Sequence, residues 1–465
     1  MKREKGVKQC MKLLLTALML VMVLTTGVKA QAATWVEINQ KNFPDSGARE
    51  ALINKASYED NFKQSKGKYY VNVTGVTNLY FYGENNIKSY DFLKKFTRLE
   101  SISLYDVKTT RVDFTKNTRL TQISISYAPR LVSIKCPKSV QSLSLYETNI
   151  SRLDVRELQG LKSLSVRGNK KLCAVDVSNN KKLEVLDASD SSIRSIDVRK
   201  CKRLTSLDCY NAKLADLKIG KNTKLKSINV HDNKKLTNLD TSLCPNLKDV
   251  TAWNTGTTEF DATKNRKLES LVLSGTAIKT LDVTKCPKLI KLDVSSTAIK
   301  TLNVTKCYKL RYLVVNDTAI KALNVTKNRN LETIWVSGAK KLKSLNVTQC
   351  PKLRSVDISG SGITKINLTR NKKLSYFCPG NTCKKITGVK GRKSIELGYS
   401  GLKKGSVVSL KNIIGSGYTL SQKNKNIRFN PKTMKFQILK KASYSEWIYL
   451  KKGNSSCTIY IDYLN

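Results

Sequence analysis

Side chains suited to acid–base, nucleophilic or metal chemistry are few in this sequence. The chain has a single histidine, His231, so a nucleophile–histidine relay has one candidate base and no constellation around it. The carboxylates follow a repeat and form no close pair of the kind that glycosidases use. No glycine-rich phosphate loop leads from a strand into a helix, and no close pair of Cys or His has zinc spacing. The sequence therefore predicts no enzyme, no metal site and no cofactor.

A second set of residues points to binding. One column of side chains follows a short apolar–polar–apolar step. It contains Tyr105, Ser126, Tyr146, Arg167, Ser189, Tyr210, His231, Trp253, Ser274, Ser295, Asn316, Ser337 and Ser359. Because the apolar residues of the step occupy the interior, this column is expected to face solvent, on the concave face. Tyr210, His231 and Trp253 fall in consecutive repeats and are predicted to form a strip about 10 Å long.

The strip is a candidate ligand-binding surface. Exposed Tyr and Trp side chains are good anchors for proteins and for sugar faces, so we predict binding by Tyr210, His231 and Trp253, extended by Tyr312 and Trp335 from other strand positions. The alternative is that aromatic residues on a sheet simply pack across strands.

Asparagine and cysteine alternate in another column, three or four residues before a repeating Leu or Val. The column contains Asn117, Cys136, Asn180, Cys201, Asn222, Cys244, Asn265, Cys286, Cys307, Asn328, Cys350 and Asn371. Interchange of Asn and Cys indicates a buried slot, because a structural Cys behaves as a small apolar residue with a weak S–H donor. Parallel Cβ vectors make disulfides between stacked coils geometrically poor, so free buried thiols are expected. Cys378 and Cys383 differ: they flank a short loop where the repeat ends, and a loop-closing disulfide there is left open.

These columns share one period, since a Leu or Val recurs about every 21 residues from Leu99 to Leu374. Such a short unit cannot bury apolar residues like Leu268, Leu271 and Leu273 alone. Stacked coils bury them, with parallel strands about 4.8 Å apart.

One segment, Leu204-T-S-L-D-C-Y-N-A-K-Leu214, fits the pattern L-x-x-L-x-L-x-x-N-x-L. Over roughly residues 36 to 380, the chain resembles the secreted bacterial, Firmicutes-type leucine-rich-repeat proteins. The resemblance implies a mainly β fold, a leucine-rich-repeat solenoid with about 21-residue coils and parallel strands, preceded by a small helical N-terminal cap. It implies no single function, because this fold hosts many unrelated binding roles.

A further column lies in the second half of each repeat. It contains Asp154, Asp176, Asp197, Asp240, Asp261 and Asp282, then Asn303, Asn324, Asn346 and Asn367. Stacked carboxylates repel, and neighbouring Lys279 and Lys285 are expected to relieve this repulsion. Three of the asparagines begin an Asn-Val-Thr glycosylation pattern, which we interpret as a by-product of the repeat.

The two ends divide the chain further. Residues 1–32 have a basic start, an apolar run from Leu13 to Leu24 and a small-x-small site, which predicts a signal peptide; no later stretch predicts a membrane span. Residues 33–98 are predicted to form the cap, with a helix beginning near Asp45 or Ser46. Its stretch 62–67 lacks the carboxylates of the calcium loop found in related caps, so no calcium site is expected there. The solenoid is assigned to 99–383. Short alternating runs predict a β-rich C-terminal domain over 384–465.

The formal net charge of +49 favours anionic partners in general. Nucleic acid is not expected, because no zinc-ligand spacing, aromatic RNA-binding motif or helix-turn-helix pattern is present. Stripes of lysine flank the Asn/Cys column, at Lys264, Lys267, Lys285, Lys288, Lys306, Lys309 and Lys352. They either keep the solenoid soluble or bind an anionic cell-envelope polymer such as teichoic acid.

The leading hypothesis is a secreted, non-catalytic recognition protein, extracellular or loosely attached to the cell surface, that binds a protein or a glycan through the solenoid face. The alternative is an envelope-associated structural protein held to polyanions by its lysines.

Overall fold

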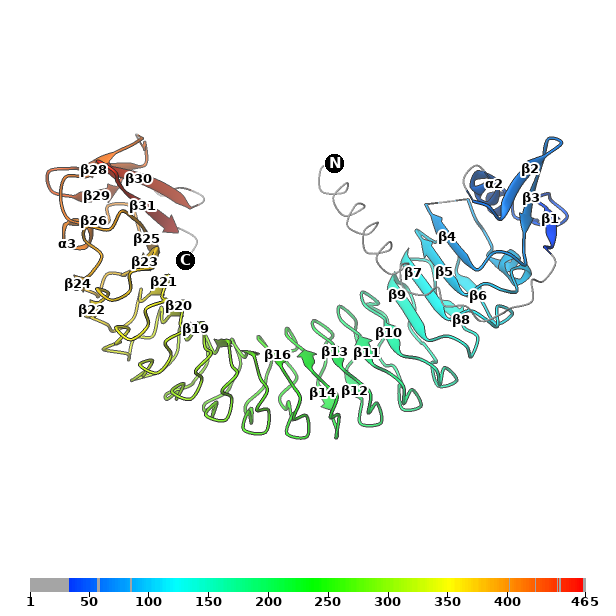
Figure 1. Ribbon diagram of the computed structural model, residues 1–465, viewed down its shortest axis with the longest axis horizontal. Coiled ribbons are helices and arrows are strands. Elements are labelled where there is room, and N and C mark those ends of the chain that lie inside the picture. Colours follow the sequence, from blue (N-terminus) through cyan, green and yellow to red (C-terminus); the bar gives the residue numbers. More distant parts are fainter. Residues whose placement is uncertain are drawn as a thin grey trace.

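The computed structural model describes residues 33–56, 59–83, 86–400, 402–422, 424–440, 442 and 445–462. The predicted signal peptide, residues 1–32, lies outside the described residues. The chain winds into an open arc of stacked coils, with additional β structure at each end (Figure 1). Strands line the inner, concave side of the arc, and a few short strand pairs lie on its outer, convex side. The mainly β solenoid predicted from the sequence is confirmed.

One long parallel sheet forms the concave side. Its strands, in order, are β4 (Asn78–Tyr82), β5 (Ser101–Tyr105), β7 (Gln122–Ala128), β9 (Ser142–Thr148), β10 (Ser163–Ser165), β11 (Val185–Asp187), β13 (Ser206–Asp208), β15 (Ser227–Asn229), β16 (Asp249–Thr251), β17 (Ser270–Val272), β18 (Lys291–Asp293), β19 (Tyr312–Val314), β20 (Thr333–Trp335), β21 (Ser355–Asp357), β23 (Tyr376–Cys378) and β25 (Ser394–Ser400). Leu207 pairs with Ile228, and Ile228 with Val250, so the register advances by one coil of roughly 21 residues per strand. Stacking thus aligns equivalent residues in straight columns.

The middle residue of each short strand points inward and the two flanking residues point into the concavity. In β13, for example, Leu207 is fully buried between Ser206 and Asp208, which are half-buried. The buried Leu, Ile and Val residues of successive coils form one continuous core. A single coil has no such core, so each coil depends on its neighbours for burial.

The convex side contains three parallel strand pairs. They are β6 (Arg111–Asp113) with β8 (Ser133–Lys135), β12 (Ser195–Asp197) with β14 (Asp216–Lys218), and β22 (Lys365–Asn367) with β24 (Lys385–Thr387). The Asp/Asn column predicted from the repeat lies here. In Asp282, Oδ1 accepts hydrogen bonds from the backbone N–H and the hydroxyl of Thr284, and Asn324 accepts the same pair from Thr326. Asp and Asn interchange because only an acceptor oxygen is needed.

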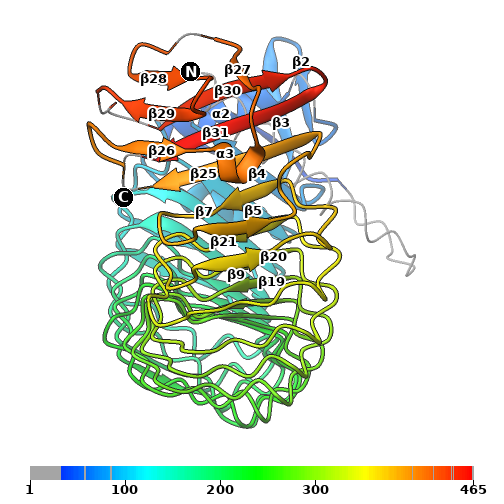
Figure 2. The same ribbon diagram turned by 90° about the vertical axis from the view of Figure 1, so that its left-hand side faces the viewer.

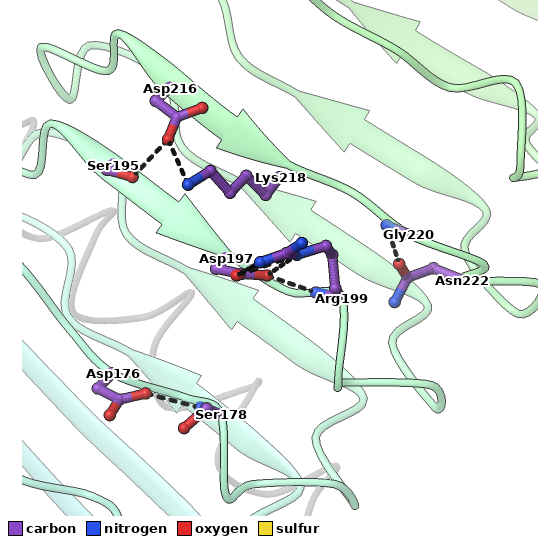
Figure 3. Close-up of polar contacts among 9 residues, drawn as sticks. All are labelled: Asp176, Ser178, Ser195, Asp197, Arg199, Asp216, Lys218, Gly220 and Asn222. Carbon is purple, nitrogen blue, oxygen red and sulfur yellow. Dashed lines mark hydrogen bonds and ion pairs between the residues drawn. The ribbon is translucent and has the colours of Figure 1, made fainter.

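Figure 3 shows where this column is interrupted. Asp176 accepts from the backbone of Ser178, and Asp197 binds the backbone and guanidinium of Arg199. In the next coil, Lys218 occupies the column position and pairs with Asp216 at 3.3 Å. The turn N–H of Gly220 is then capped by Asn222 instead. Repulsion between stacked carboxylates is therefore relieved mainly by hydroxyl, backbone and arginine donors. Lys285 contributes as expected, because its charge helps to lower the pKa of Asp282, but neither Lys279 nor Lys285 forms an ion pair among the described residues.

The Asn/Cys column ties each coil to the preceding one. Nδ2 of Asn328 donates to the carbonyls of Val304 and Cys307, both at 2.9 Å. Asn117, Asn180, Asn222, Asn265 and Asn371 make the equivalent pair of bonds. Cys307 instead directs its thiol to the carbonyl of Val283 at 3.5 Å. The slot thus requires a buried donor aimed at backbone carbonyls.

The N-terminal cap contains the predicted helix. Helix α2 spans Ser46–Lys55, and Oδ1 of its N-cap Asp45 accepts from the backbone of Ala48, which confirms the predicted start. The other carboxylate oxygen binds the backbone N–H groups of residues 88 and 89, which lead into the first coil. The remaining cap elements are β1 (Trp35–Glu37), β2 (Phe62–Ser65), β3 (Lys68–Asn72) and the 3-10 helix η1 (Asp91–Lys95). Residues 62–67 therefore form a strand and a hairpin turn.

The concave sheet continues into the C-terminal region. Strand β25 pairs in parallel with β31 (Ser455–Asp462), which pairs with β30 (Glu446–Lys452) and through it with β27 (Thr419–Leu420), as the end-on view shows (Figure 2). A smaller sheet has the order β26 (Val407–Ser409), β29 (Lys435–Ile438), β28 (Ile427–Asn430), next to the short helix α3 (Lys411–Ile414). These strands coincide with the alternating runs seen in the sequence, and they cover the last coil.

Candidate functional site

Three of the predicted site residues stack on the concave face. The rings of Tyr210 and His231 lie 4.6 Å apart and those of His231 and Trp253 lie 4.3 Å apart, with interplanar angles of 9° and 10°. The register of β13, β15 and β16 brings these residues onto consecutive coils. The Nδ1 of His231 lies 3.0 Å from a carboxylate oxygen of Asp232, which fixes the plane of the imidazole. Both faces of the His231 ring are therefore covered.

Arg167 extends this stack toward the N-terminus. Its guanidinium lies 5.2 Å from the centre of the Tyr210 ring and 5.9 Å from that of Tyr146, so it spans the coil in which Ser189 supplies no ring. Asp190 holds the guanidinium through Nε at 3.1 Å. An Arg between two aromatic faces gains cation–π stabilisation and stays ordered.

A cluster of tyrosines continues the row. The rings of Tyr82 and Tyr105 are 6.2 Å apart, those of Tyr105 and Tyr127 are 5.0 Å apart, and those of Tyr127 and Tyr146 are 5.3 Å apart. Tyr80 packs on Tyr82 at 5.8 Å. We call the whole set the aromatic row. It consists of Tyr80, Tyr82, Tyr105, Tyr127, Tyr146, Arg167, Tyr210, His231 and Trp253.

The N-terminal members of the aromatic row were missed as site residues by the sequence analysis. Tyr80, Tyr82 and Tyr127 are 37%, 45% and 37% exposed, more open than the stack around His231. Tyr127, with φ of 53°, supplies the ring absent at Ser126 from a turn position that is also left-handed in neighbouring coils, as at Asp106 and Glu147. This conformation is a regular feature of the repeat, and Asp, Asn or Gly fills the position in most coils, so only the bulky side chain at residue 127 is unusual. The Tyr-x-Tyr alternation at residues 80–82 was the available sequence signal.

Tyr312 and Trp335 lie outside the aromatic row. Tyr312 and Trp335 stand at the first and third positions of β19 and β20, whereas the column of Tyr105, Tyr146 and Trp253 passes through Asn316 and Ser337 in these coils. The intervening coils carry Ser274 and Ser295 in that column. No ring contact within the described part of the chain links either residue to Trp253. Nε1 of Trp335 donates to the hydroxyl of residue 355. Both side chains are exposed on the concave face, but as isolated rings.

An open groove of about 840 Å³ runs beside the aromatic row, lined in part by Tyr127, Tyr146, Arg167 and Asp190. The concave strands next to it carry more carboxylates than cations. The acidic members of the outward strand positions are Asp187, Asp208, Asp249, Asp293, Asp357 and Glu396, and the only cation in those strand positions of the described chain is Lys291. Burial raises the pKa of Asp208, Asp249 and Asp357. The concave face is thus opposite in sign to the chain as a whole.

The loop-closing disulfide left open for Cys378 and Cys383 is not formed. The thiol of Cys378 points to the carbonyl of Gly398 in the next coil at 3.0 Å, while that of Cys383 lies near the carbonyl of residue 385. All cysteines in the described part of the chain are free thiols. Among the same residues there is no cluster of three or more His, Cys, Asp or Glu side chains arranged to hold a metal ion.

No model of a known protein family matches the chain, and no curated protein matches its sequence. Several solved structures do match the fold of the chain. The functional domain of InlJ from Listeria monocytogenes, which includes a cysteine ladder, superposes with a TM-score of 0.64 at 20% identity, over 93% of this chain and 99% of that one. A leucine-rich-repeat protein of Leptospira interrogans gives 0.54 at 20% identity, over 66% and 90% of the two chains.

This chain is a leucine-rich-repeat solenoid. The internalin InlF of Listeria monocytogenes is also similar, with a TM-score of 0.52 at 19% identity, over 73% of this chain and 96% of that one. These three neighbours are bacterial leucine-rich-repeat proteins, as the sequence resemblance implied. At these identities the likeness is one of fold, so the leucine-rich-repeat architecture carries over while ligands do not. Within the described residues, no helix has the length and apolar character needed to span a bilayer.

Proposed function

We propose that this leucine-rich-repeat protein is a non-catalytic recognition protein that binds another protein through its concave face. The observation that supports this most strongly is the aromatic row, in which rings and one guanidinium touch across successive coils from Tyr80 to Trp253. Tyr, Trp and Arg are the residues most enriched at energetic centres of protein interfaces. Mutual stacking fixes their rotamers, so little side-chain entropy remains to be lost on binding.

The stacking geometry favours a protein over a glycan. Sugars bind aromatic residues through an open ring face, but both faces of His231 are covered, and Arg167 covers one face of Tyr210. The ring edges and the hydroxyls of the row remain available, and these suit the mixed polar and apolar contacts of a protein surface. A glycan is the second candidate because the outer face of Trp253 looks toward Ser274, a residue too small to cover it.

We further propose that the protein is exported and acts outside the cell or loosely attached to its surface. This proposal rests on the basic, apolar and small-residue order of residues 1–32.

Capture experiments test the recognition proposal. The chain from residue 33 onward, which contains every described element, is immobilised and exposed to extracts of bacterial envelope and of host cell surfaces at 500 mM salt. Captured proteins are identified by mass spectrometry, and the affinity of each purified candidate is then measured by calorimetry. Loss of two stacked rings in Tyr210→Ala/Trp253→Ala is expected to weaken binding at least a hundredfold, because interface hot spots contribute about 2 kcal/mol or more each.

Matched variants locate the site. Tyr127→Ala/Tyr146→Ala tests the N-terminal part of the row, and Tyr308→Ala removes a 49% exposed tyrosine that lies off the concave face. The Tyr308 variant is expected to bind normally. If it loses as much affinity as the row variants, or if the row variants keep full affinity, the concave face is not the recognition surface. Capture of oligosaccharides but no protein would favour the glycan.

A further inference from the structure

The edge of the solenoid where the chain returns from the convex to the concave side is strongly basic. We define the Asn/Cys edge as residues 262–268, 283–289, 304–310, 325–331, 347–353 and 368–374. Its cations are Lys264, Arg266, Lys267, Lys285, Lys288, Lys306, Lys309, Lys327, Arg329, Lys352, Arg370, Lys372 and Lys373, and all are exposed. These six turns contain no Asp or Glu. The edge is therefore a continuous cationic strip.

The carboxylates of the same coils are engaged elsewhere. Asp261 and Asp282 accept hydrogen bonds from Thr263 and Thr284 on the convex side, and Asp293 binds its own concave turn. Glu332, next to the edge, is held by two bonds from Arg311. Within the described residues, no cation of the Asn/Cys edge forms an ion pair. The strip therefore keeps a net positive charge, although Asp261, Asp282 and Glu332 attract Lys264, Lys285 and Lys352 through space.

Stacking arranges these charges in lines. Lys264, Lys285, Lys306 and Lys327 follow the same threonine in four consecutive coils, so they form one column with a spacing of about 5 Å. Arg329 and Arg370 line a shallow groove of about 580 Å³ that crosses neighbouring coils at the C-terminal end of the strip. A linear polymer running along the arc would meet at least one cation per coil.

The chemistry of the edge selects among polyanions. Lysine and arginine side chains are hydrogen-bond donors only, and a phosphodiester offers acceptors only. Glycan hydroxyls also need acceptors, which at the edge are limited to threonine and tyrosine hydroxyls, Gln349 and Asn330, whose oxygen already accepts from Lys352. Nucleic acid bases need aromatic stacking platforms, and Tyr308 is the sole aromatic residue in the six turns. We propose that the Asn/Cys edge binds a linear phosphodiester polymer without bases. This surface is separate from the concave recognition face and does not depend on it.

The control for the test is built into the same coils. Lys279, Lys300 and Lys321 form an exposed column where the chain passes from the concave to the convex side, on the opposite edge. We therefore compare Lys285→Gln/Lys306→Gln/Lys327→Gln with Lys279→Gln/Lys300→Gln/Lys321→Gln. Both remove three charges of the same type from matched coils. Thermal unfolding of both variants shows that the fold is intact.

The probes are a fluorescent poly(glycerol phosphate) oligomer and single-stranded DNA with the same number of phosphates, titrated against the chain from residue 33 onward at 50–500 mM NaCl. Each phosphate contact contributes about 0.7 to the slope of log K against log salt, so three lost contacts lower its magnitude by about 2. Relative to 1 M salt, where the counterion term vanishes, this corresponds at 50 mM salt to a loss of affinity of roughly 500-fold for the edge variant. The control variant should lose less than about threefold.

Three results would overturn the proposal. Equal losses in the two variants would show that binding follows overall charge and not this edge. Tighter binding of DNA than of the base-free polymer would assign the surface to nucleic acid. Absence of binding to the glycerol phosphate polymer at 50 mM salt would leave the edge as a solubilising surface only.

Discussion

Two asparagines in one coil, Asn324 and Asn328, should respond in opposite ways to the same substitution by aspartate. Asn324 uses its oxygen, which accepts from the backbone N–H and hydroxyl of Thr326 at 3.0 and 2.7 Å. Asn328 uses its nitrogen, which donates to the carbonyls of Val304 and Cys307, and its own oxygen has no partner among the described residues. Aspartate preserves the first function and abolishes the second.

The magnitudes follow from these contacts. Asn328 is fully buried, so Asn328→Asp leaves two carbonyls without their donor and places an acceptor against them. Each unsatisfied buried group costs roughly 1–3 kcal/mol, which gives a loss of about 4 kcal/mol in the free energy of unfolding. Asn324→Asp keeps both bonds, as Asp282 does with Thr284 in an earlier coil, and should change stability by less than about 0.5 kcal/mol.

Urea unfolding followed by circular dichroism measures both variants beside the parent chain. Asn328→Cys is the graded control, because Cys307 occupies the same slot with one weak S–H donor, and it should lose about half as much as Asn328→Asp. Burial raises the pKa of a carboxyl, so the penalty of Asn328→Asp should shrink as the pH falls from 7 toward 4. Equal shifts of the unfolding midpoint for Asn324→Asp and Asn328→Asp would refute the assignment of donor and acceptor columns.

Three other outcomes are expected. Burial raises the pKa of Cys307 to about 12, whereas Cys173 is exposed. A thiol reagent at pH 8 should therefore label Cys173 in the folded chain and Cys307 only after unfolding. Comparable labelling rates for the two thiols would contradict the burial of the Asn/Cys column. Because His231 is the single histidine and lies against Trp253, Trp253→Ala should move its ring-proton NMR signals downfield, and unchanged signals would exclude the stack. Hydrogen bonds from the hydroxyl and the backbone N–H of Thr284 lower the pKa of Asp282, so its carboxylate stabilises the fold above the unfolded pKa of about 4, and this contribution disappears as the pH falls through the lower folded pKa. Asp282→Asn should therefore flatten the decline of the melting temperature below pH 4. An unchanged profile would argue against these hydrogen bonds to the carboxylate of Asp282.

The coil architecture was predictable because burial imposes it. A single unit of about 21 residues cannot bury its own Leu and Val side chains, so the period alone implies that the units stack. The helix start was also readable, since Asp45 precedes a helix-forming run and supplies a cap. These features depend on apolar periodicity and local hydrogen bonding, which the sequence carries directly.

Other features depend on orientation, which residue type does not specify. Asn324 and Asn328 look alike in the sequence, yet one amide acts through its oxygen and the other through its nitrogen. Tyr127 joins the aromatic row from the left-handed turn position next to the column, and the column position itself holds Ser126. Tyr312 was proposed to extend the strip, but it begins β19, four residues before Asn316, which holds the column of Trp253 in that coil. The disulfide left open between Cys378 and Cys383 also depended on side-chain orientation, because the two thiols point to different backbone carbonyls.

The net charge of +49 is an average that describes no single surface of the solenoid. Equivalent residues of successive coils share one environment, so a residue type repeated in one column determines the charge and polarity of a whole face. The concave strand positions collect carboxylates such as Asp208 and Asp293, while the Asn/Cys edge has only cations. A polyanion is therefore repelled by the face that carries the aromatic row and attracted to the edge. Binding at the edge would hold the concave face near an anionic surface and raise its effective concentration toward a partner there, so the two proposed surfaces are complementary and separable by substitution.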